Sequence, residues 1–389
     1  MNEFLSILAI MNSQNKSSAA PRAVVNCRAF RDNLHAVRAY VGPAVRIMAV
    51  IKANGYGHGM LHLAGEADAM GIGDFGVARV HEGLELRKAG FAQRILVFEA
   101  ARDADIRPAL EAGLTLTVVT PAFLEEVASV ARTIGAKAAV HVKLDTGMGR
   151  LGLMPEQAAV LIEKTASSRW VSLEGVYSHF ATSEDQDKTF ARDQLARFMD
   201  TLDVVRRAGI DVPLRHMANS GAIISMPETY LDMVRPGIML YGYPPGMGME
   251  ELHPVRPVLS LVSRVAFVKT VAPGVSISYG RRYFTGQRTT IVTVPLGYGD
   301  GYSRLLTGNA DALIRGRRYP VVGTICMDQL MVALPPEDPV ETGDEVILIG
   351  DSGNERITAW DLAGRTGTIP YETTCALTPR VPREYEGCT

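Results

Sequence analysis

The sequence has 389 residues, with 40 Lys and Arg against 42 Asp and Glu and a formal net charge of −2. Its 47% hydrophobic and 21% charged residues are typical of a folded chain, so general disorder is excluded. The near-zero charge excludes a broad basic surface, so we expect neither a nucleic acid nor a membrane as a partner. At roughly 100–200 residues per domain, the length indicates two domains.

The cysteine content indicates a reducing compartment. The four cysteines are Cys27, Cys326, Cys375 and Cys388. They show no C-x-x-C spacing and are too few for a disulfide scaffold, so we expect a cytoplasmic protein.

The start of the chain does not fit a membrane segment. The apolar stretch 1–11 contains Glu3 and is far shorter than the roughly 20 residues that cross a bilayer. We interpret residues 1–20 as a loose leader that precedes the folded domains.

From residue 21 to residue 257, short apolar runs alternate with stretches of helical periodicity. The candidate strands are 47–51, 72–78, 94–98, 114–119, 138–144, 171–178, 214–217 and 233–240. The clearest helical stretches between them are 61–70, 81–88, 121–134 and 184–207. Eight strand–helix units in this length predict an α/β fold, a parallel (β/α)8 TIM barrel, with an open doubly wound sheet as the alternative.

The composition changes near residue 246. The segment 246–257 is rich in Gly, Pro, His and Met and is typical of a linker. Beyond it, β-branched runs at 259–271, 289–294, 321–325 and 346–349 are separated by Gly and Pro turns. We therefore predict a second domain, residues 258–389, that consists mostly of β-strands.

The segment 49–59, AVIKANGYGHG, places Lys52 at the end of the first barrel strand, before a glycine-rich loop. A lysine there is often a solvated strand end. In a barrel mouth, however, burial lowers the pKa of the amine and frees it to attack a carbonyl. The carboxyl ends of barrel strands carry the chemistry in this fold, so we expect Lys52 to be functional.

Polar residues follow four later strands of the predicted barrel, at 143–150, 178–182, 217–221 and 233–238. Small residues after the seventh and eighth strands allow backbone N–H groups to approach a phosphate. A lysine, a phosphate cradle and aromatic residues together favour pyridoxal 5′-phosphate as the cofactor.

Two weaker sequence signals would indicate a dinucleotide-binding loop and a zinc site. Residues 147–152 match G-x-G-x-x-G, but Pro155 predicts that the next helix begins later than a dinucleotide loop requires. His58 and His62 are four residues apart but lack the glutamate of a zinc motif, so we expect no metal.

In the second domain, four short segments combine polar and aromatic residues. They are 276–281, 296–304, 326–330 and 369–372. Tyrosines in turns are often only surface packing residues, and without the barrel site we would assign them that role.

The motifs together resemble those of bacterial alanine racemases, from about Arg22 to Tyr385. In chain order they are AVIKANGYGHG, KLDTGMGRLG, YSHFATSED, HMANSGA, VRPGIMLYG, SYGRR, PLGYGDGYSR, CMDQ and PYE. The resemblance implies a fold-type III pyridoxal phosphate enzyme that acts on a small amino acid, and a homodimer with two shared active sites.

The resemblance also implies roles for individual residues. Lys52 matches the Schiff-base lysine and one acid/base, and Tyr279 matches the opposing acid/base, donated by the partner subunit. Cofactor-binding positions are Lys52, Tyr56, His179, Asn219, Ser220, Arg235, Gly237, Ile238 and Tyr371. Substrate-binding positions are Arg150, Met327, Asp328 and Tyr298, with Arg304, Glu184 and Ile369 along the corridor. Lys143 matches a lysine that is often carbamylated, and Thr324 replaces a common corridor arginine.

The implied reaction is isomerisation of L-alanine to D-alanine for peptidoglycan synthesis, through a pyridoxal phosphate external aldimine. Two acid/base groups on opposite faces of Cα remove and return the proton. An arginine at the pyridine nitrogen stays protonated, leaves that nitrogen unprotonated and weakens the electron sink. This disfavours a decarboxylase, and the second domain disfavours a non-catalytic single-barrel cofactor carrier. Because of Thr324, a broad-specificity racemase on the same fold remains the alternative.

Overall fold

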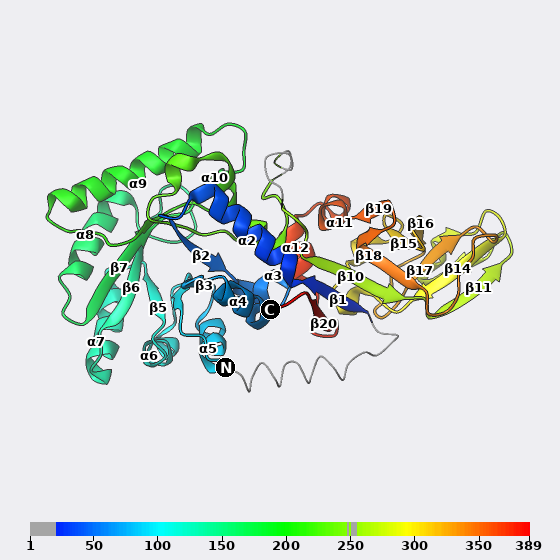
Figure 1. Ribbon diagram of the computed structural model, residues 1–389, viewed down its shortest axis with the longest axis horizontal. Coiled ribbons are helices and arrows are strands. Elements are labelled where there is room, and N and C mark those ends of the chain that lie inside the picture. Colours follow the sequence, from blue (N-terminus) through cyan, green and yellow to red (C-terminus); the bar gives the residue numbers. More distant parts are fainter. Residues whose placement is uncertain (1–20, 247–248, 250–254) are drawn as a thin grey trace. The chain divides into compact units, whose positions relative to one another are not determined.

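The computed structural model describes residues 21–246, 249 and 255–389, so the leader predicted for residues 1–20 lies outside the described residues. The chain forms two compact units (Figure 1). The barrel unit contains residues 29–55 and 60–256, and the β unit contains residues 21–28, 56–59 and 257–389.

The barrel unit contains the predicted closed parallel barrel, which confirms the fold class. Its strands, in the order in which they pair, are β2 (Arg46–Val50), β3 (Asp74–Val77), β4 (Arg94–Val97), β5 (Thr115–Val118), β6 (Ala138–Lys143), β7 (Val171–Tyr177), β8 (Arg215–His216) and β9 (Met233–Val234). Every neighbouring pair is parallel, and β9 pairs with β2 to close the ring. The run predicted as one strand at 233–240 ends early and continues into the 3-10 helix η2 (Ile238–Tyr241).

Helices connect the strands of the barrel. They are α2 (Cys27–Val41), α3 (Lys52–Tyr56), α4 (Met60–Ala69), α5 (Val80–Lys88), α6 (Asp103–Glu111), α7 (Pro121–Ile134), α8 (Pro155–Ala166), α9 (Thr189–Arg207) and α10 (Ser220–Ser225). The limits of α7 follow its sequence: the Thr120 side chain caps its start, and Gly135 ends it with a φ of 72°. Helix α8 begins at Pro155, so the G-x-G-x-x-G segment is a loop and does not open a helix.

The β unit is built on a ten-stranded sheet. Its strand order is β11-β14-β17-β16-β15-β18-β10-β1-β20, and β19 pairs with β18. The bounds are β1 (Arg22–Asn26), β10 (Leu259–Arg264), β11 (Phe267–Val271), β14 (Thr289–Val294), β15 (Asp311–Ile314), β16 (Arg317–Val322), β17 (Leu330–Leu334), β18 (Glu345–Ser352), β19 (Glu355–Ile357) and β20 (Arg383–Glu386). A second, two-stranded sheet joins β12 (Ser276–Ile277) and β13 (Tyr283–Phe284). Two short helices lie between β19 and β20 in the chain, α11 (Ala359–Thr366) and α12 (Pro370–Cys375).

Residues 22–28 and 56–59 belong to the β unit, although the sequence analysis places them in the barrel domain. Strand β1 pairs with β10 in antiparallel and with β20 in parallel orientation, as Figure 1 shows. The two ends of the described chain therefore lie side by side in one sheet. Strand pairing between residues about 360 positions apart leaves no signal in local periodicity.

One pair of cysteines is bonded, which the sequence analysis does not predict. Cys27 and Cys388 form a disulfide, whereas Cys326 and Cys375 are free. The two bonded residues lie 361 positions apart in the sequence, so the spacing of cysteines could not reveal the pair.

Among the described residues, each helix is too short or too polar to cross a membrane.

Candidate active site

The segment after strand β2 forms a left-handed turn. Ala53, Asn54 and Tyr56 have φ values of 53°, 52° and 52°, and Gly55 between them has a φ of 60°. Non-glycine residues avoid this region because Cβ approaches the carbonyl oxygen, so the turn stores strain at a sequence position predicted to be functional. Lys52 is half-buried at the start of this turn, directly after the barrel strand.

Glu82 on helix α5 holds the left-handed turn in place. Its buried carboxylate accepts a hydrogen bond from the backbone N–H of Ala53 at 2.6 Å, and two more from Ala78 and Arg79 at 2.7 and 3.0 Å. Hydrogen bonds from three backbone donors to one carboxylate are stronger than neutral ones and fix the backbone that follows the lysine. The sequence analysis did not single out Glu82, because a glutamate in a helix gives no local sign of this role.

Lys143 lies at the end of strand β6 with only 4% of its surface exposed. Burial, together with the positive charge of Arg235, lowers the pKa of its amine well below the usual range. The Nζ atom donates to the carbonyl oxygen of Leu144 at 3.1 Å and lies 4.9 Å from the ring centroid of Tyr177. Burial in this position therefore favours the neutral form of the Lys143 amine over its charged form.

Arg235 is buried in the barrel unit, with 4% of its surface exposed. Its described hydrogen bonds go to uncharged acceptors, among them His216 Nδ1 at 2.8 Å and the carbonyl oxygen of Ser178 at 2.8 Å. Burial lowers the pKa of its guanidinium to about 10, so the group is still cationic at neutral pH. A buried cation held by neutral partners is stabilised further by any electron-rich acceptor that enters the mouth.

His216, which contacts Arg235, is itself held in place by His141 and Tyr177. His216 Nε2 lies 2.8 Å from His141 Nδ1, and the His216 ring stacks on Tyr177 with centroids 4.9 Å apart. Burial lowers the pKa of both histidines, to about 3 for His141. Since Arg235 donates to His216 Nδ1, the His216 proton sits on Nε2 and is donated to His141. This network of His141, Tyr177 and His216 was not predicted from the sequence, because its three residues come from three different strands.

His179 follows strand β7 and contacts the same arginine. Its Nδ1 lies 3.2 Å from Arg235 Nη2. Burial and the nearby cations, including Lys52, lower the pKa of His179 well below its usual value, so its ring is neutral. Four of the predicted residues, Lys52, Lys143, His179 and Arg235, thus act on one another within the barrel unit.

The small residues after strands β8 and β9, which the sequence analysis predicts to bind a phosphate, lie in two loops that contact each other. Ser220 Oγ accepts the backbone N–H of Gly237 at 3.0 Å, and the Asn219 side chain caps helix α10 through the N–H of Ala222. A Cβ atom on Gly221 would lie 2.8 Å from Ser183 Oγ, so only glycine fits there. Ser220, Gly237 and the adjacent Ile238 are buried together, which confirms that these two loops meet.

These residues fit pyridoxal 5′-phosphate. A phosphate requires backbone donors that small residues leave approachable, and an aromatic nitrogen that accepts a hydrogen bond suits a guanidinium, which can only donate. A neutral imidazole suits a flat ring beside it. The barrel unit contains all three kinds of group: the small residues around Ser220 and Gly237, the guanidinium of Arg235 and the neutral imidazole of His179.

In the β unit, Tyr56 and Tyr371 lie together. Their ring centroids are 5.9 Å apart, at an angle of 46°. Burial, then the neighbouring Tyr371 and Cys375, raise the pKa of Tyr56, so its phenol keeps its proton and can donate it in a hydrogen bond. Two of the predicted phosphate-binding residues are therefore adjacent within this unit.

Tyr279 is exposed over 72% of its surface. It lies in a tight turn in which Ser278 and Gly280 have positive φ values of 65° and 71°. Thr324 Oγ1 donates to the carbonyl oxygen of Tyr279 at 2.8 Å, and the Thr324 carbonyl oxygen accepts from Ser278 Oγ at 2.6 Å. Thr324, with 2% exposure, thus supports the tyrosine turn from inside the unit.

The CMDQ turn is attached to the glycine-rich segment 296–304. The N–H of Gly299 donates to the Met327 carbonyl oxygen at 2.9 Å, and a Cβ on Gly297 would lie 2.3 Å from the same oxygen. Asp328 pairs with Arg380 at 2.6 Å. The Met327 side chain is half-exposed, whereas the backbone of its turn is held by the hydrogen bond from Gly299.

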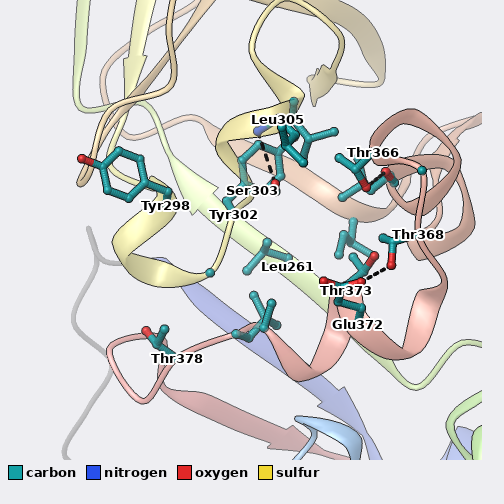
Figure 2. Close-up of a pocket in the computed structure, with 17 residues that line it drawn as sticks. Leu261, Tyr298, Tyr302, Ser303, Leu305, Thr366, Thr368, Glu372, Thr373 and Thr378 are labelled. Atoms are coloured by element: carbon teal, nitrogen blue, oxygen red, sulfur yellow. Dashed lines mark hydrogen bonds between the residues drawn. The ribbon is translucent and has the colours of Figure 1, made fainter.

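A cavity of about 460 Å³ opens within the β unit (Figure 2). It lies between the 3-10 helices η5 (Tyr298–Asp300) and η6 (Arg304–Leu306) and the helices α11 and α12. Tyr298, predicted for the substrate corridor, lines it together with Leu305 and Glu372. The Glu372 carboxylate accepts a hydrogen bond from the Thr368 hydroxyl, drawn as a dashed line in Figure 2.

The remaining corridor predictions fall in both units. Glu184 lies in the loop before α9 and accepts a hydrogen bond from Ser183 Oγ at 3.1 Å. Arg150, predicted to bind the substrate, follows the loop that Asp145 organises, and its backbone N–H donates to that carboxylate at 3.2 Å. Arg304 and Ile369 belong to the β unit, and Ile369 is exposed over half its surface.

A closed parallel barrel with a half-buried lysine after its first strand, a buried arginine and a cradle of small residues defines a class of pyridoxal phosphate enzymes. Comparison with known proteins agrees for both parts of the chain. Residues 25–245 match the family described as "Alanine racemase, N-terminal domain", and residues 258–385 match "Alanine racemase, C-terminal domain". The chain belongs to the alanine racemase family, and its cofactor is pyridoxal 5′-phosphate.

Individual relatives are similar over nearly the whole chain. Alanine racemases of Desulforamulus reducens and Symbiobacterium thermophilum are each 42% identical over 94% of this chain, and over 98% and 97% of their own lengths. Among solved structures, the alanine racemase of Clostridium difficile 630 has a TM-score of 0.92 at 36% identity, covering 95% of this chain and 96% of its own. That from a Streptomyces lavendulae that produces D-cycloserine has a TM-score of 0.90 at 37% identity, covering 95% of this chain and 98% of its own.

Proposed function

We propose that this protein is an isomerase that interconverts L-alanine and D-alanine with pyridoxal 5′-phosphate, in the cytoplasm, and so supplies D-alanine for peptidoglycan. Membership in the alanine racemase family supports the reaction. The single observation that carries it is Arg235, a buried cation whose described hydrogen bonds are all to uncharged groups.

Arg235 favours a racemase over other reactions on this fold. When bound, the cofactor withdraws electrons from Cα of the amino acid. A guanidinium donates a hydrogen bond to the pyridine nitrogen but does not give up its proton, so that withdrawal stays moderate. A decarboxylase is served by an acidic partner, which protonates that nitrogen. His216 and His141 keep the guanidinium in one orientation, because each accepts or donates one fixed hydrogen bond.

Two residues of the chain move the proton. In one direction of the reaction, the Lys52 amine removes the proton from one face of Cα, and the Tyr279 phenol returns a proton to the other face, which inverts Cα. In the opposite direction the two residues exchange these roles. Tyr56, Ser220, Gly237, Ile238 and Tyr371 bind the phosphate, with Asn219 holding the cradle. His179 lies against the cofactor ring. Arg150, Met327, Asp328 and Tyr298 bind or admit the substrate.

A second subunit supplies Tyr279 in this proposal. The turn that carries Tyr279 exposes 72% of that side chain, and Met327 nearby in the same unit exposes 51%. Exposed aromatic and methionine side chains are enriched at protein interfaces. We propose a homodimer in which the β unit of one chain completes the barrel mouth of the other.

Lys143 is carbamylated in this proposal. Carbon dioxide reacts with the neutral form of an amine, and burial next to Arg235 favours that form of Lys143 by lowering its pKa. The reaction forms an N–C bond to carbon dioxide and releases one proton. The product is an anion that can accept hydrogen bonds from Arg150, instead of a cation that competes with it. Electron density that ends in a plain ammonium, in crystals grown with bicarbonate, contradicts this assignment.

The test of the whole proposal is optical. The purified protein should absorb visible light as a pyridoxal phosphate enzyme does, and L-alanine incubated with it should lose its optical rotation. A yellow protein that leaves the rotation of L-alanine unchanged contradicts the proposed reaction while retaining the cofactor.

A broad-specificity racemase is the second candidate, because Thr324 stands where relatives commonly have a corridor arginine. We expect alanine first, serine weakly, and lysine or arginine hardly at all, since rigid tyrosine rings leave room for about one methyl group. Comparison of kcat/KM for L-alanine, L-serine and L-lysine decides the question. Lysine turnover within about tenfold of alanine, a gap of about 1.4 kcal/mol, establishes the broader activity.

A further inference from the structure

The disulfide between Cys27 and Cys388 lies at the end of a strand pair. Strands β1 and β20 run parallel, with Val25 opposite Tyr385 and Asn26 opposite Glu386. Cys27 follows β1 directly, and Cys388 comes two residues after β20. The disulfide therefore joins the two segments that follow these paired strands, and it fixes β20 to β1 covalently as well as by hydrogen bonds.

Strand β20 contacts the turn 56–59. Arg383 Nε donates to the carbonyl oxygen of Gly57 at 2.9 Å. A Cβ on Gly59 would lie 1.8 Å from the Tyr385 hydroxyl oxygen, so this tyrosine fills the space beside the glycine. The same arginine binds the carbonyl oxygens of Leu377, Thr378 and Val381, which anchors it within the β unit.

The other side of the turn faces helix α12. A Cβ on Gly57 would lie 2.1 Å from the Thr374 carbonyl oxygen, and the Tyr56 ring lies against that of Tyr371. The turn is thus held between α12 and β20, and it carries a tyrosine that the proposed function assigns to the cofactor phosphate. Strand β20 contacts this turn at Gly57 and at Gly59, so a change in the order of β20 acts on the backbone that carries the tyrosine.

We propose that Cys27 and Cys388 form a redox-sensitive staple that fixes strand β20 and, through Arg383 and Tyr385, the cofactor-binding turn 56–59. The argument that the bond forms rests on the pairing of β1 with β20, which brings Cys27 and Cys388 together. Its effect on the cofactor rests on the proposed function. Arg383 and Tyr385 are positioning residues, because they act on the cofactor only through the turn.

The chemistry is thiol–disulfide exchange with a low-molecular-weight disulfide. The thiolate of Cys388, which is exposed, attacks one sulfur of the small disulfide and releases one thiol. The thiolate of Cys27 then attacks Cys388 in the mixed disulfide and releases the second thiol. Two cysteine thiols are oxidised and one small disulfide is reduced to two thiols. In the reducing compartment proposed above, the staple would close only under oxidation.

The first experiment counts thiols in the holoenzyme. After incubation with oxidised glutathione, removal of the excess and denaturation, alkylation should modify two cysteines, Cys326 and Cys375. After incubation with dithiothreitol, it should modify four. Cys375→Ser should keep the bond, whereas Cys27→Ser and Cys388→Ser should each lose it. Four reactive thiols after oxidation overturn the staple.

The second experiment follows order in the turn and retention of the cofactor. Amide hydrogen exchange in residues 56–59 and 383–386 should become faster when the bond is reduced. Pyridoxal phosphate should then leave about fivefold faster, which is at the low end of ordinary coupling between two sites. The Cys27→Ser/Cys388→Ser double variant should be insensitive to reductant, and Cys375→Ser should remain sensitive. Equal exchange in both redox states overturns the coupling.

A third variant separates the contact from the bond. Tyr385→Phe keeps the ring and the disulfide but removes the hydroxyl group beside Gly59, so exchange in 56–59 should rise even in the oxidised protein. No change in that exchange contradicts the route through Tyr385. If none of the variants takes up pyridoxal phosphate, the proposed function fails, while the thiol count still decides the staple.

Discussion

The mouth of the barrel and the Tyr279 turn of the β unit carry the two proposed proton-transfer groups, but they are built differently. The barrel side is internally complete: Arg235 is 4% exposed and is held by histidines and backbone carbonyl oxygens of its own unit. The Tyr279 side chain is 72% exposed, and its turn is anchored by side-chain hydroxyl groups that donate to backbone carbonyl oxygens, Thr324 Oγ1 to Tyr279 and Ser278 Oγ to Thr324.

This difference indicates which part of the chemistry one chain can organise by itself. Groups that tune the cofactor must be fixed before it binds, since a buried cation needs its partners in place at all times. A tyrosine that completes the site from another subunit needs a rigid backbone and a free side chain until the two chains meet. Variants on either side of this contrast should therefore differ in their effects, and those at Lys52 should be the most severe.

Replacement of Lys52 should abolish function. Lys52→Ala removes both the attachment point of the cofactor and one proton-transfer group, so borohydride should no longer fix the cofactor to the protein. Racemisation should fall by at least about 10⁴-fold, the upper range for a general acid or base alone. Lys137→Ala, an exposed lysine between α7 and β6, serves as the control. Unchanged borohydride fixation would falsify the assignment.

Replacement of Tyr279 should be nearly as severe but rescuable. Tyr279→Phe should lower kcat by about 10²–10⁴-fold without loss of bound cofactor, because the barrel side is intact. Mixed with Lys52→Ala, it should regain up to about a quarter of normal activity, since half of randomly assorted dimers contain one intact site. Absence of recovery, with subunit exchange verified by tagged chains, argues that Tyr279 acts within its own chain.

Acid should destabilise the barrel before the β unit. The depressed pKa values among the described histidines, including about 3 for His141 and about 4 for His62, belong to the barrel unit. The unfolded chain binds protons below about pH 6.5 that the folded barrel excludes, so this stability is complete above pH 6.5 and is lost as the pH falls toward 3.

Each such histidine contributes a slope of about 1.4 kcal/mol per pH unit in that window. Urea unfolding between pH 7.5 and 5 measures the slope, and hydrogen exchange shows which unit opens first. His141→Asn should reduce the slope, and His35→Asn, at an exposed position, should not. Earlier opening of the β unit at pH 5 contradicts the contrast between the two regions.

Removal of the Glu82 carboxylate should loosen the turn after Lys52. Glu82→Gln replaces an acceptor of three backbone hydrogen bonds with an amide that has one acceptor oxygen. The free energy of unfolding should fall by about 2 kcal/mol, and the cofactor should dissociate faster. Glu85→Gln, exposed on the same helix, is the matched control. Equal stability of the two variants excludes a positioning role for Glu82.

Thr324→Val should have the smallest effect. It keeps the shape but removes the hydroxyl that donates to Tyr279, so kcat/KM for L-alanine should fall by about threefold, a loss of one neutral hydrogen bond. Thr133→Val, in an exposed helix position, should change nothing. A shift in the serine-to-alanine ratio instead of a general loss contradicts this supporting role and makes Thr324 a specificity residue, as the sequence resemblance implies.

The sequence alone was enough to predict the eight-stranded barrel, the mostly-β second domain and the family. Alternating apolar runs, stretches of helical periodicity and the motifs around Lys52 and Tyr279 are local features, which can be recognised without coordinates. The loops predicted to hold a phosphate do meet, because strands β8 and β9 are neighbours in the barrel.

Only the tertiary structure identified the residues that support those positions. Glu82 reaches Ala53 from another helix, His141 reaches Arg235 through His216, and Cys27 meets Cys388 across 361 positions. Each contact joins segments that are distant in the chain. Composition and periodicity record what a residue is and how it alternates with its neighbours. They do not record which distant residue lies opposite it, and that pairing sets the charge and order of this site.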